Sequence, residues 1–370
     1  MKHCVIVGGG IIGLLSAREL RRAGWAVTLI ERRRTGQEAS WAGGGILCPL
    51  HPWRYPDAVS RLARWSQRLY PELVEELRQD TGLDPEYERS GLLVLASSEV
   101  EAARHWAARF DVALEILTPQ QALEIEPALD PAAAVPELLW LPHMAQVRNP
   151  RLVKALRRWL ERAGVELLEG RRVTGFDLAG DRIRAVTTEG GPVTADLVVV
   201  AAGAWSASLL EPLGWRPPIR PVKGQMLLFR GSPGLLRRIL LQDANYLIPR
   251  RDGRILAGST QEEAGFDKGI SPAAGDALRA MAIERVPALA DLPVEHHWAG
   301  LRPGSPEGIP LIGPHPQLEN LFLNTGHFRN GVLLAPASAR LLADLVRGRE
   351  PAVDPTPYTL NIAGKRPIMR

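Results

Sequence analysis

Three glycines near the start of the chain have the spacing of a phosphate-binding turn. Gly8, Gly10 and Gly13 form a G-x-G-x-x-G motif directly after an apolar segment over 4–7, and they open a segment of helical periodicity over 12–23. In such a turn the first glycine permits a tight bend, the second lets the backbone approach a pyrophosphate, and the third lets the helix pack closely on the strand. The N–H groups at the helix N-terminus then point at the phosphates. The pattern predicts a dinucleotide site.

A carboxylate stands where such a site would bind a ribose. Glu31 ends a second predicted strand over 26–31, about 20 positions after the glycines, where it can accept hydrogen bonds from ribose hydroxyls. The acid disfavours a 2′-phosphate, although Arg32, Arg33 and Arg34 beside it weaken that argument. The motif therefore leaves NAD, FAD and NADP open. The alternative interpretation is a structural glycine turn followed by an ordinary surface glutamate.

Composition excludes several other classes of protein. A chain of 370 residues with 45% hydrophobic and 23% charged residues is long enough for two packed domains. The formal net charge is +4, and Arg32–Arg34 is the one basic run, which is far from the pattern of a nucleic-acid binder. No apolar segment reaches the length of a membrane span. Cys4 and Cys48 cannot make a disulfide framework, and no Cys/His cluster indicates zinc, so we expect a reducing cytoplasm.

The elements that must position these residues alternate between strand and helix at both ends of the chain. Further helices are predicted over 60–80, 151–163 and 332–346. From Gly224 the pattern changes to short apolar segments between Gly, Pro and Asp turns, which is typical of a β-meander. Its predicted strands are 225–230, 246–249 and 254–258. We expect a mixed α/β fold of two interleaved domains, with a loosely ordered tail after Glu350.

Four glycine-rich motifs in the expected order resemble one family. They lie over 39–46, 201–206, 300–313 and 326–331, and the second follows a predicted buried strand. Together they resemble the D-amino-acid-oxidase-like flavoproteins, and within that family the glycine oxidases. The resemblance extends over nearly the whole chain.

The resemblance implies a two-domain fold of the p-hydroxybenzoate hydroxylase type, with a Rossmann-like FAD domain and a β-rich substrate domain. Some relatives attach their flavin to a cysteine in the C-terminal half. This chain has no cysteine after Cys48, so we expect noncovalent FAD. The predicted FAD domain comprises 1–85, 143–218 and 300–350, the substrate domain 86–142 and 219–299, and the tail 351–370.

Carried over by position, the resemblance implies a set of residues that contact FAD. At the pyrophosphate and the adenosine these are Gly8, Gly10, Ile11, Ile12, Gly13, Glu31, Arg32 and Val173. Along the flavin and beside it they are Ala39, Ser40, Gly44, Gly45, Ile46 and Gly203. At the pyrimidine end of the flavin they are His327, Phe328, Arg329, Asn330, Gly331, Val332 and Leu333. There the N-terminus of the last helix would stabilise negative charge on the reduced flavin.

Arg302 is the predicted clamp for a substrate carboxylate, because a guanidinium fork holds a carboxylate through two hydrogen bonds. Tyr246 is expected to hydrogen-bond the same carboxylate. Arg329 contacts either the substrate with its side chain or the flavin with its backbone, and Ile46 and Cys48 are expected to line the pocket. The alternatives are a structural arginine at 302 and a strand tyrosine packed on the core at 246. Cys48 is a small apolar residue in this interpretation and not a nucleophile.

The implied activity is oxidative deamination of glycine, sarcosine and small D-amino acids. Hydride would leave Cα of the neutral amine for the flavin, the imino acid would hydrolyse to an oxo acid and ammonia or methylamine, and O2 would be reduced to H2O2. The resemblance also implies a supply of dehydroglycine for thiazole and thiamine synthesis and a homo-oligomer, by analogy a tetramer. No nucleic acid and no stable membrane association are expected. The alternatives are a quinone-linked D-amino acid dehydrogenase, a nicotinamide dehydrogenase and a non-catalytic dinucleotide-binding sensor.

Overall fold

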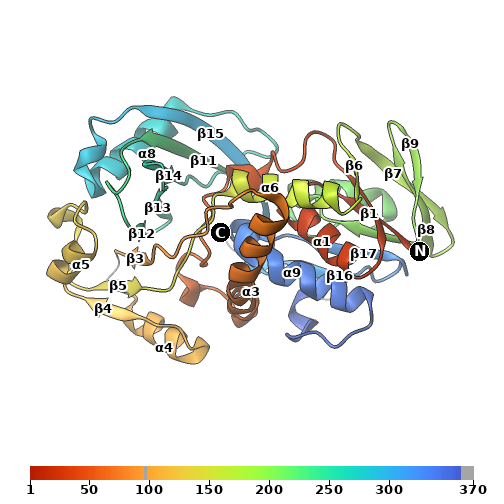
Figure 1. Cartoon of the computed structure of the whole chain (residues 1–370), viewed down its shortest axis with the longest axis horizontal. Helices are drawn as coiled ribbons and strands as arrows, with labels where there is room; N and C mark the ends of the chain where they lie inside the picture. Colours follow the sequence, from red (N-terminus) through yellow and green to blue (C-terminus); the bar gives the residue numbers. More distant parts are fainter. Residues whose placement is uncertain (96–97, 360–370) are drawn as a thin grey trace.

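The computed structural model describes residues 1–95 and 98–359. A six-stranded sheet lies towards one end of the molecule, in the order β16-β17-β10-β1-β2-β6 (Figure 1). Its strands are β1 (His3–Val7), β2 (Ala26–Ile30), β6 (Glu166–Leu168), β10 (Leu197–Val200), β16 (Leu311–Pro314) and β17 (Leu321–Thr325). All run parallel except β16. Because both faces of a parallel sheet are covered, its strands are continuous apolar runs.

The two faces of this sheet bury alternate residues of each strand. Cys4 and Ile6 of β1 belong to a core shared with helices, whereas Val5 and Val7 pack toward a three-stranded sheet on the other face. The helices are α1 (Ile11–Arg22), α3 (Asp57–Thr81), α6 (Asn149–Arg162) and α9 (Gly331–Val346). The three-stranded sheet consists of β7 (Val173–Ala179), β8 (Arg182–Thr188) and β9 (Gly191–Thr194). The parallel strands are therefore held between two layers, and their carboxyl ends share one edge.

An eight-stranded sheet forms the other end of the molecule, in the order β15-β11-β14-β13-β12-β3-β5-β4 (Figure 1). Its strands are β3 (Leu92–Val94), β4 (Glu115–Leu117), β5 (Leu138–Leu141), β11 (Arg220–Arg230), β12 (Ile239–Gln242), β13 (Asn245–Pro249), β14 (Arg254–Gly258) and β15 (Val294–Gly304). The remaining helices are α2 (Ala39–Ala42), α4 (Val100–Phe110), α5 (Pro119–Ile125), α7 (Ser206–Leu210) and α8 (Pro272–Arg285). Two cores, one on each face, hold this sheet together.

The predicted strands and helices are present, but their neighbours in the β-rich part differ from the prediction. The strand predicted over 225–230 begins at Arg220, and its long antiparallel partner β15 has no counterpart in the sequence analysis. The six-stranded sheet draws on segments assigned to the FAD domain. β15 crosses the boundary placed at 299, because its pairing with β11 runs from Val294 to Gly304. The domain boundaries stay a prediction.

The expectation of a loosely ordered tail is wrong for 351–359. Tyr358, in a short 3-10 turn over Thr356–Tyr358, is 1% exposed, and its hydroxyl donates to the carbonyl of Ala58 at 2.7 Å. A buried aromatic ring with a satisfied hydroxyl fixes this segment against α3. Residues 360–370 lie outside the described part of the chain.

Candidate functional site

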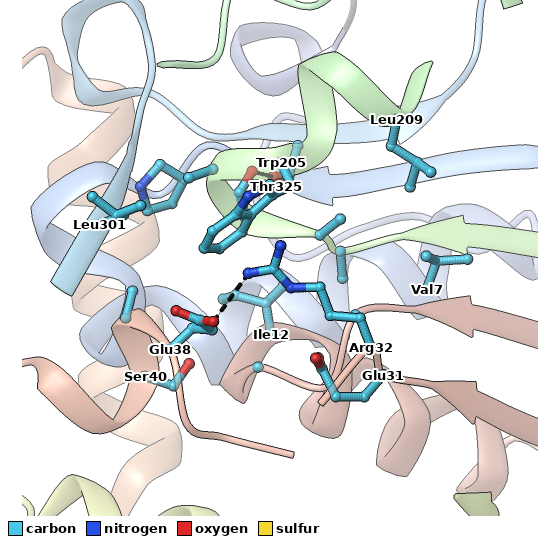
Figure 2. A pocket seen from close by; sticks show the side chains of 18 of the residues that line it. Val7, Ile12, Glu31, Arg32, Glu38, Ser40, Trp205, Leu209, Leu301 and Thr325 are labelled. Carbon is cyan, nitrogen blue, oxygen red and sulfur yellow. Dashed lines mark hydrogen bonds and ion pairs between the residues drawn. The ribbon is translucent and has the colours of Figure 1, made fainter. Parts of the chain in front are cut away.

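A cavity of about 530 Å³ opens at the carboxyl ends of the parallel strands (Figure 2). Val7, Ile30 and Thr325 close β1, β2 and β17 on its wall, and Ala201 follows β10 there. From this edge the cavity extends to residues 301–303 on β15 of the eight-stranded sheet. The two sheets therefore share one site.

The glycine motif forms the floor of this cavity, and its geometry requires glycine. Gly8 has φ +115°, and a Cβ there would lie 2.4 Å from the carbonyl oxygen of Ala201. A Cβ at Gly13 would lie 1.9 Å from the carbonyl oxygen of Gly8. The N-cap of α1 is Gly10, which has no side chain, and the N–H of Ile11 donates to the hydroxyl of Ser40 at 2.8 Å. The helix N-terminus thus faces the cavity without a Cβ in the way, which fits a pyrophosphate.

The Glu31 carboxylate is fixed in place by two backbone donors. The N–H of Gly9 donates to one of its oxygens at 2.8 Å, and the N–H of Arg33 donates to the other at 3.0 Å. Glu31 is 9% exposed and lines the cavity. A carboxylate has further acceptor sites beyond these two bonds, so it can still accept from a ribose.

Arg32, Glu38 and Trp205 form a connected group on the cavity wall. The Arg32 guanidinium lies over the Trp205 ring at 3.7 Å and pairs with Glu38 at 3.0 Å (Figure 2). Burial tends to raise the pKa of Glu38, but hydrogen bonds and charges from Lys268 and Arg32 outweigh it and hold that pKa below its ordinary value. Glu38 is therefore an anion that orders two cations.

Arg302 is a cation at the far end of the cavity, and its hydrogen-bond partners among the described residues are all neutral. Its guanidinium donates to the Ser259 hydroxyl at 2.7 Å and to the carbonyls of Lys223 and Thr260 at 3.2 Å each. Within the described residues, no carboxylate lies within ion-pair distance of it. Burial lowers the pKa of Arg302, as does Arg329, whereas Tyr246 raises it. Neutral partners thus orient a charge that is left for an anion in the cavity.

Gly224 on β11 makes room for that guanidinium. A Cβ at this position would lie 2.2 Å from both terminal nitrogens of Arg302. Because β11 pairs with β15 across Val222 and Arg302, the strand register fixes this close approach. Gly224 lies outside every motif used in the sequence analysis.

Tyr246 and Cys48 belong to one apolar cluster, and Tyr246 also lies close to Arg302. Tyr246 is 7% exposed, and its hydroxyl donates to the sulfur of Met226 at 3.8 Å. Cys48 belongs to the same cluster, with Ile46 packed against it. Burial raises the pKa of the Cys48 thiol to about 12, which leaves it protonated and unreactive.

Arg329 and His327 lie at the start of α9. The Arg329 guanidinium donates to the carbonyl of Ala244 at 3.1 Å, on the turn between β12 and β13. His327 is 1% exposed and within hydrogen-bond distance of Ser338, 3.0 Å from its hydroxyl. Burial lowers the pKa of His327 to about 3, so its imidazole is neutral.

The glycine segment 43–45 is held through its carbonyls by groups behind the cavity. Asn149 donates to the carbonyl of Gly43 at 2.8 Å, and Arg250 donates to that of Gly44 at 2.7 Å. The Arg250 guanidinium also donates to Gln146 at 2.6 Å and to the carbonyl of Val147 at 3.0 Å. Burial, with the charge of Arg148, lowers the pKa of Arg250 to about 10. Sequence reasoning missed this arginine because a Pro-Arg-Arg-Asp-Gly segment looks like an exposed turn.

The structure brings most of the predicted cofactor residues to one cavity. Of these, the cavity is lined by Gly8, Gly10, Ile11, Ile12, Glu31, Arg32, Ala39, Ser40, Val173, Gly203, His327, Phe328, Arg329, Gly331 and Val332. Its walls do not include Gly13, Gly44, Gly45, Ile46, Asn330 and Leu333. Of the predicted substrate residues, Arg302 and Arg329 line it, and Tyr246, Ile46 and Cys48 do not. Lining residues that sequence reasoning missed include Glu38, Arg171, Arg172, Glu189 and Trp205. Trp205 lies inside the motif over 201–206, and Arg171 and Arg172 directly precede Val173.

The parallel sheet, the glycine turn, the ribose carboxylate and the uncompensated cation define a protein that binds a dinucleotide beside a small anion. A family model described as FAD dependent oxidoreductase (DAO) matches residues 3–345, and the chain belongs to this family. The predicted family, the mixed α/β flavoprotein fold and the FAD cofactor are thereby confirmed, and the protein is an FAD-dependent oxidoreductase.

Several relatives are similar over nearly the whole of this chain. The chain is 51% identical to a glycine oxidase of Pseudomonas aeruginosa, over 96% of this chain and 98% of that protein. It matches the crystal structure of glycine oxidase from Geobacillus kaustophilus with a TM-score of 0.92 and 32% identity, covering 99% of this chain and 100% of that one. It is 37% identical to the bifunctional protein ThiO/ThiG of Synechocystis, over 92% of this chain and 51% of that protein.

The residues of the cavity fit FAD. The turn at Gly8 and Gly10 would hold the pyrophosphate, Glu31 the ribose, and residues 327–332 the far end of the cofactor. When bound, FAD supplies a two-electron acceptor. Within 1–95 and 98–359, no helix is long and apolar enough to cross a membrane.

Proposed function

We propose that this protein oxidises small amines that carry a carboxylate, namely glycine, sarcosine and small D-amino acids. Each turnover would convert the amine to its imino acid, which water hydrolyses to an oxo acid and ammonia or methylamine, while O2 takes the two electrons and two protons as H2O2. The observation that carries the proposal is Arg302, a fixed guanidinium on the cavity wall with no acidic partner in the described residues. The glycine oxidases among the relatives support it.

In this proposal the side chains orient and desolvate the substrate. Arg302 binds the carboxylate through two hydrogen bonds, and the hydroxyl of Tyr246 beside it adds a third donor. Positive charge at Arg302 and Arg329 lowers the pKa of a bound ammonium group and so favours the neutral amine. The apolar cluster around Ile46 and Cys48 excludes water from the same side. No side-chain base is required, because binding itself selects the deprotonated amine.

The remaining features of the proposal rest on the sequence and the relatives. Noncovalent attachment of FAD is supported by the absence of any cysteine after Cys48. A role in supplying dehydroglycine for thiazole synthesis is supported by similarity to a protein named ThiO/ThiG. A cytoplasmic homo-oligomer stays a prediction.

Peroxide release across a panel of amines tests the proposal. The panel contains glycine, sarcosine, D-alanine and amines of matched size without a carboxylate, and the proteins are wild type, Arg302→Ala and Arg302→Lys. We expect Arg302→Ala to lower kcat/KM for the carboxylate-bearing amines by about 10²- to 10³-fold, the size of a lost charge-assisted pair, with partial recovery in Arg302→Lys. Arg182→Ala, an exposed arginine paired with Glu319, is the matched control.

Two outcomes would overturn the proposal. Equal losses for amines with and without a carboxylate would remove Arg302 from substrate recognition. Turnover that needs an added quinone and produces no peroxide in air would instead identify the quinone-linked dehydrogenase.

A further inference from the structure

An exposed loop over 261–270 connects β14 to α8 and is anchored at both ends to one buried side chain. The amide of Gln225 donates to Glu262 at 2.8 Å, and its oxygen accepts from the N–H of Ser271 at 3.0 Å. Lys223 and Glu262 exchange two backbone hydrogen bonds of 3.0 Å. Gln225 is fully buried on β11, so the base of the loop is part of the eight-stranded sheet.

The tip of this loop reaches the cofactor side of the molecule. The Phe266 ring stacks on Trp205 with centroids 5.5 Å apart and planes inclined by 25°. The ammonium group of Lys268 pairs with Glu38 at 2.9 Å. Phe266 is 46% exposed, so its contact with Trp205 lies at the protein surface.

These contacts complete a closed circuit, which we call the clasp: Arg32, Glu38, Trp205, Phe266 and Lys268. Arg32 lies over Trp205 and pairs with Glu38 (Figure 2). The loop tip contacts Trp205 through Phe266 and Glu38 through Lys268. The members come from the end of β2, the start of α2, the turn after β10 and the loop.

The clasp has an inner and an outer layer. Its inner members, Arg32, Glu38 and Trp205, line the cavity, whereas Phe266 and Lys268 do not. An arginine side chain has many rotamers, and holding it in one costs conformational entropy. The outer layer therefore restricts the rotamers of side chains that line the cofactor cavity.

We infer that the loop over 261–270 belongs to the cofactor site and retains FAD, with Phe266 and Lys268 as positioning residues that act through Trp205 and Glu38. A loop of the eight-stranded sheet thereby slows the release of the cofactor from the six-stranded sheet. The inference does not depend on which amine is oxidised.

Release of FAD from the holoenzyme tests this inference. The rate is followed as the rise of free flavin fluorescence after the holoenzyme is diluted into a large volume of buffer, with no amine present. Phe266→Ala and Lys268→Ala together should speed release about tenfold, the size expected from losing one aromatic pair and one ion pair. Each single variant should give a smaller increase, and Phe266→Tyr should restore the wild-type rate.

Ile270→Ala is the matched control, because Ile270 is 51% exposed on the same loop and takes no part in the clasp. Salt gives a second readout. Raising the ionic strength should speed release in wild type and in Phe266→Ala and do so less in Lys268→Ala, where one of the two ion pairs of the clasp is already absent.

Two results would overturn the inference. One is a release rate in the double variant that matches Ile270→Ala. The other is a loss of thermal stability of the same size in the apoprotein and the holoprotein with no change in release, which would make the clasp a structural contact alone. Because no amine is used, failure here leaves the proposed oxidase activity intact, and failure of that activity leaves this result intact.

Discussion

Two arginines, Arg302 on β15 and Arg250 in the turn between β13 and β14, are alike in chemistry and differ in what surrounds them. Each donates to neutral oxygens, and neither has a carboxylate within ion-pair distance in the described residues. Burial lowers the pKa of both. An uncompensated guanidinium is therefore no sufficient sign of a binding site.

The difference lies in the cavity. Arg302 lines it, so its charge is available to a ligand, whereas the guanidinium of Arg250 joins the glycine segment 43–45 to the segment 146–147 behind it. A buried guanidinium without an acidic partner therefore indicates a binding site only where a cavity adjoins it. Where no cavity adjoins it, such a guanidinium fixes the backbone carbonyls to which it donates.

Replacing Arg302 with Met should give the largest of the expected effects, and this effect should be on turnover and not on stability. We expect kcat/KM for glycine to fall by about 10³-fold while the free energy of unfolding of the apoprotein changes by less than about 1 kcal/mol, because the lost bonds are replaced by water from the cavity. Steady-state kinetics and chemical denaturation measure the two quantities. A large loss of stability would place Arg302 in the same class as Arg250.

Replacing Arg250 with Met should give the opposite result. Removing the guanidinium leaves the carbonyls of Gly44 and Val147 and the side-chain oxygen of Gln146 without their donor. We therefore expect the free energy of unfolding of the apoprotein to fall by about 3 kcal/mol. Arg251→Met, an exposed neighbour paired with Asp84, serves as the control in urea denaturation. An unchanged unfolding free energy would contradict the assignment.

Gly224→Ala tests the position of the Arg302 guanidinium while both arginines stay in the sequence. The new methyl group would meet the Arg302 guanidinium at 2.2 Å and must displace it, so we expect KM for carboxylate-bearing amines to rise by about 10- to 100-fold. Gly175→Ala, where no atom lies within 4 Å of the added Cβ, is the control. Unchanged KM would show that Arg302 need not stay where it lies.

The sequence was informative where function depends on local backbone geometry. The roles of Gly8 and Gly13 follow from steric limits within one strand, turn and helix, and the structure places both in contacts that no other residue fits. Arg302 itself needed the family resemblance, because arginine alone in a strand carries little information.

The contacts that the sequence could not predict join residues that are far apart along the chain. The partners of Arg250 are 104 and 206 positions away, and the Lys268 partner Glu38 is 230 positions away. No local pattern marks such residues, and nothing before Gly300 distinguished β15 from a loop. The same reason explains the buried Tyr358, whose acceptor lies 300 positions earlier.

The smallest expected effect is on the pH dependence of FAD release. Burial opposes ionisation of Glu38, but its hydrogen bonds to Lys268 and Arg32 prevail and lower its pKa below the ordinary 4.5. The ion pair is then complete above that ordinary value and is lost as the pH falls through the lowered one. We expect release to speed up about twofold between pH 6 and pH 4 in wild type, and less in Lys268→Ala, where half of the circuit is already missing. Flavin fluorescence at matched ionic strength measures both rates. An identical rise in the two proteins would mean that the effect of acid does not depend on the Glu38–Lys268 pair.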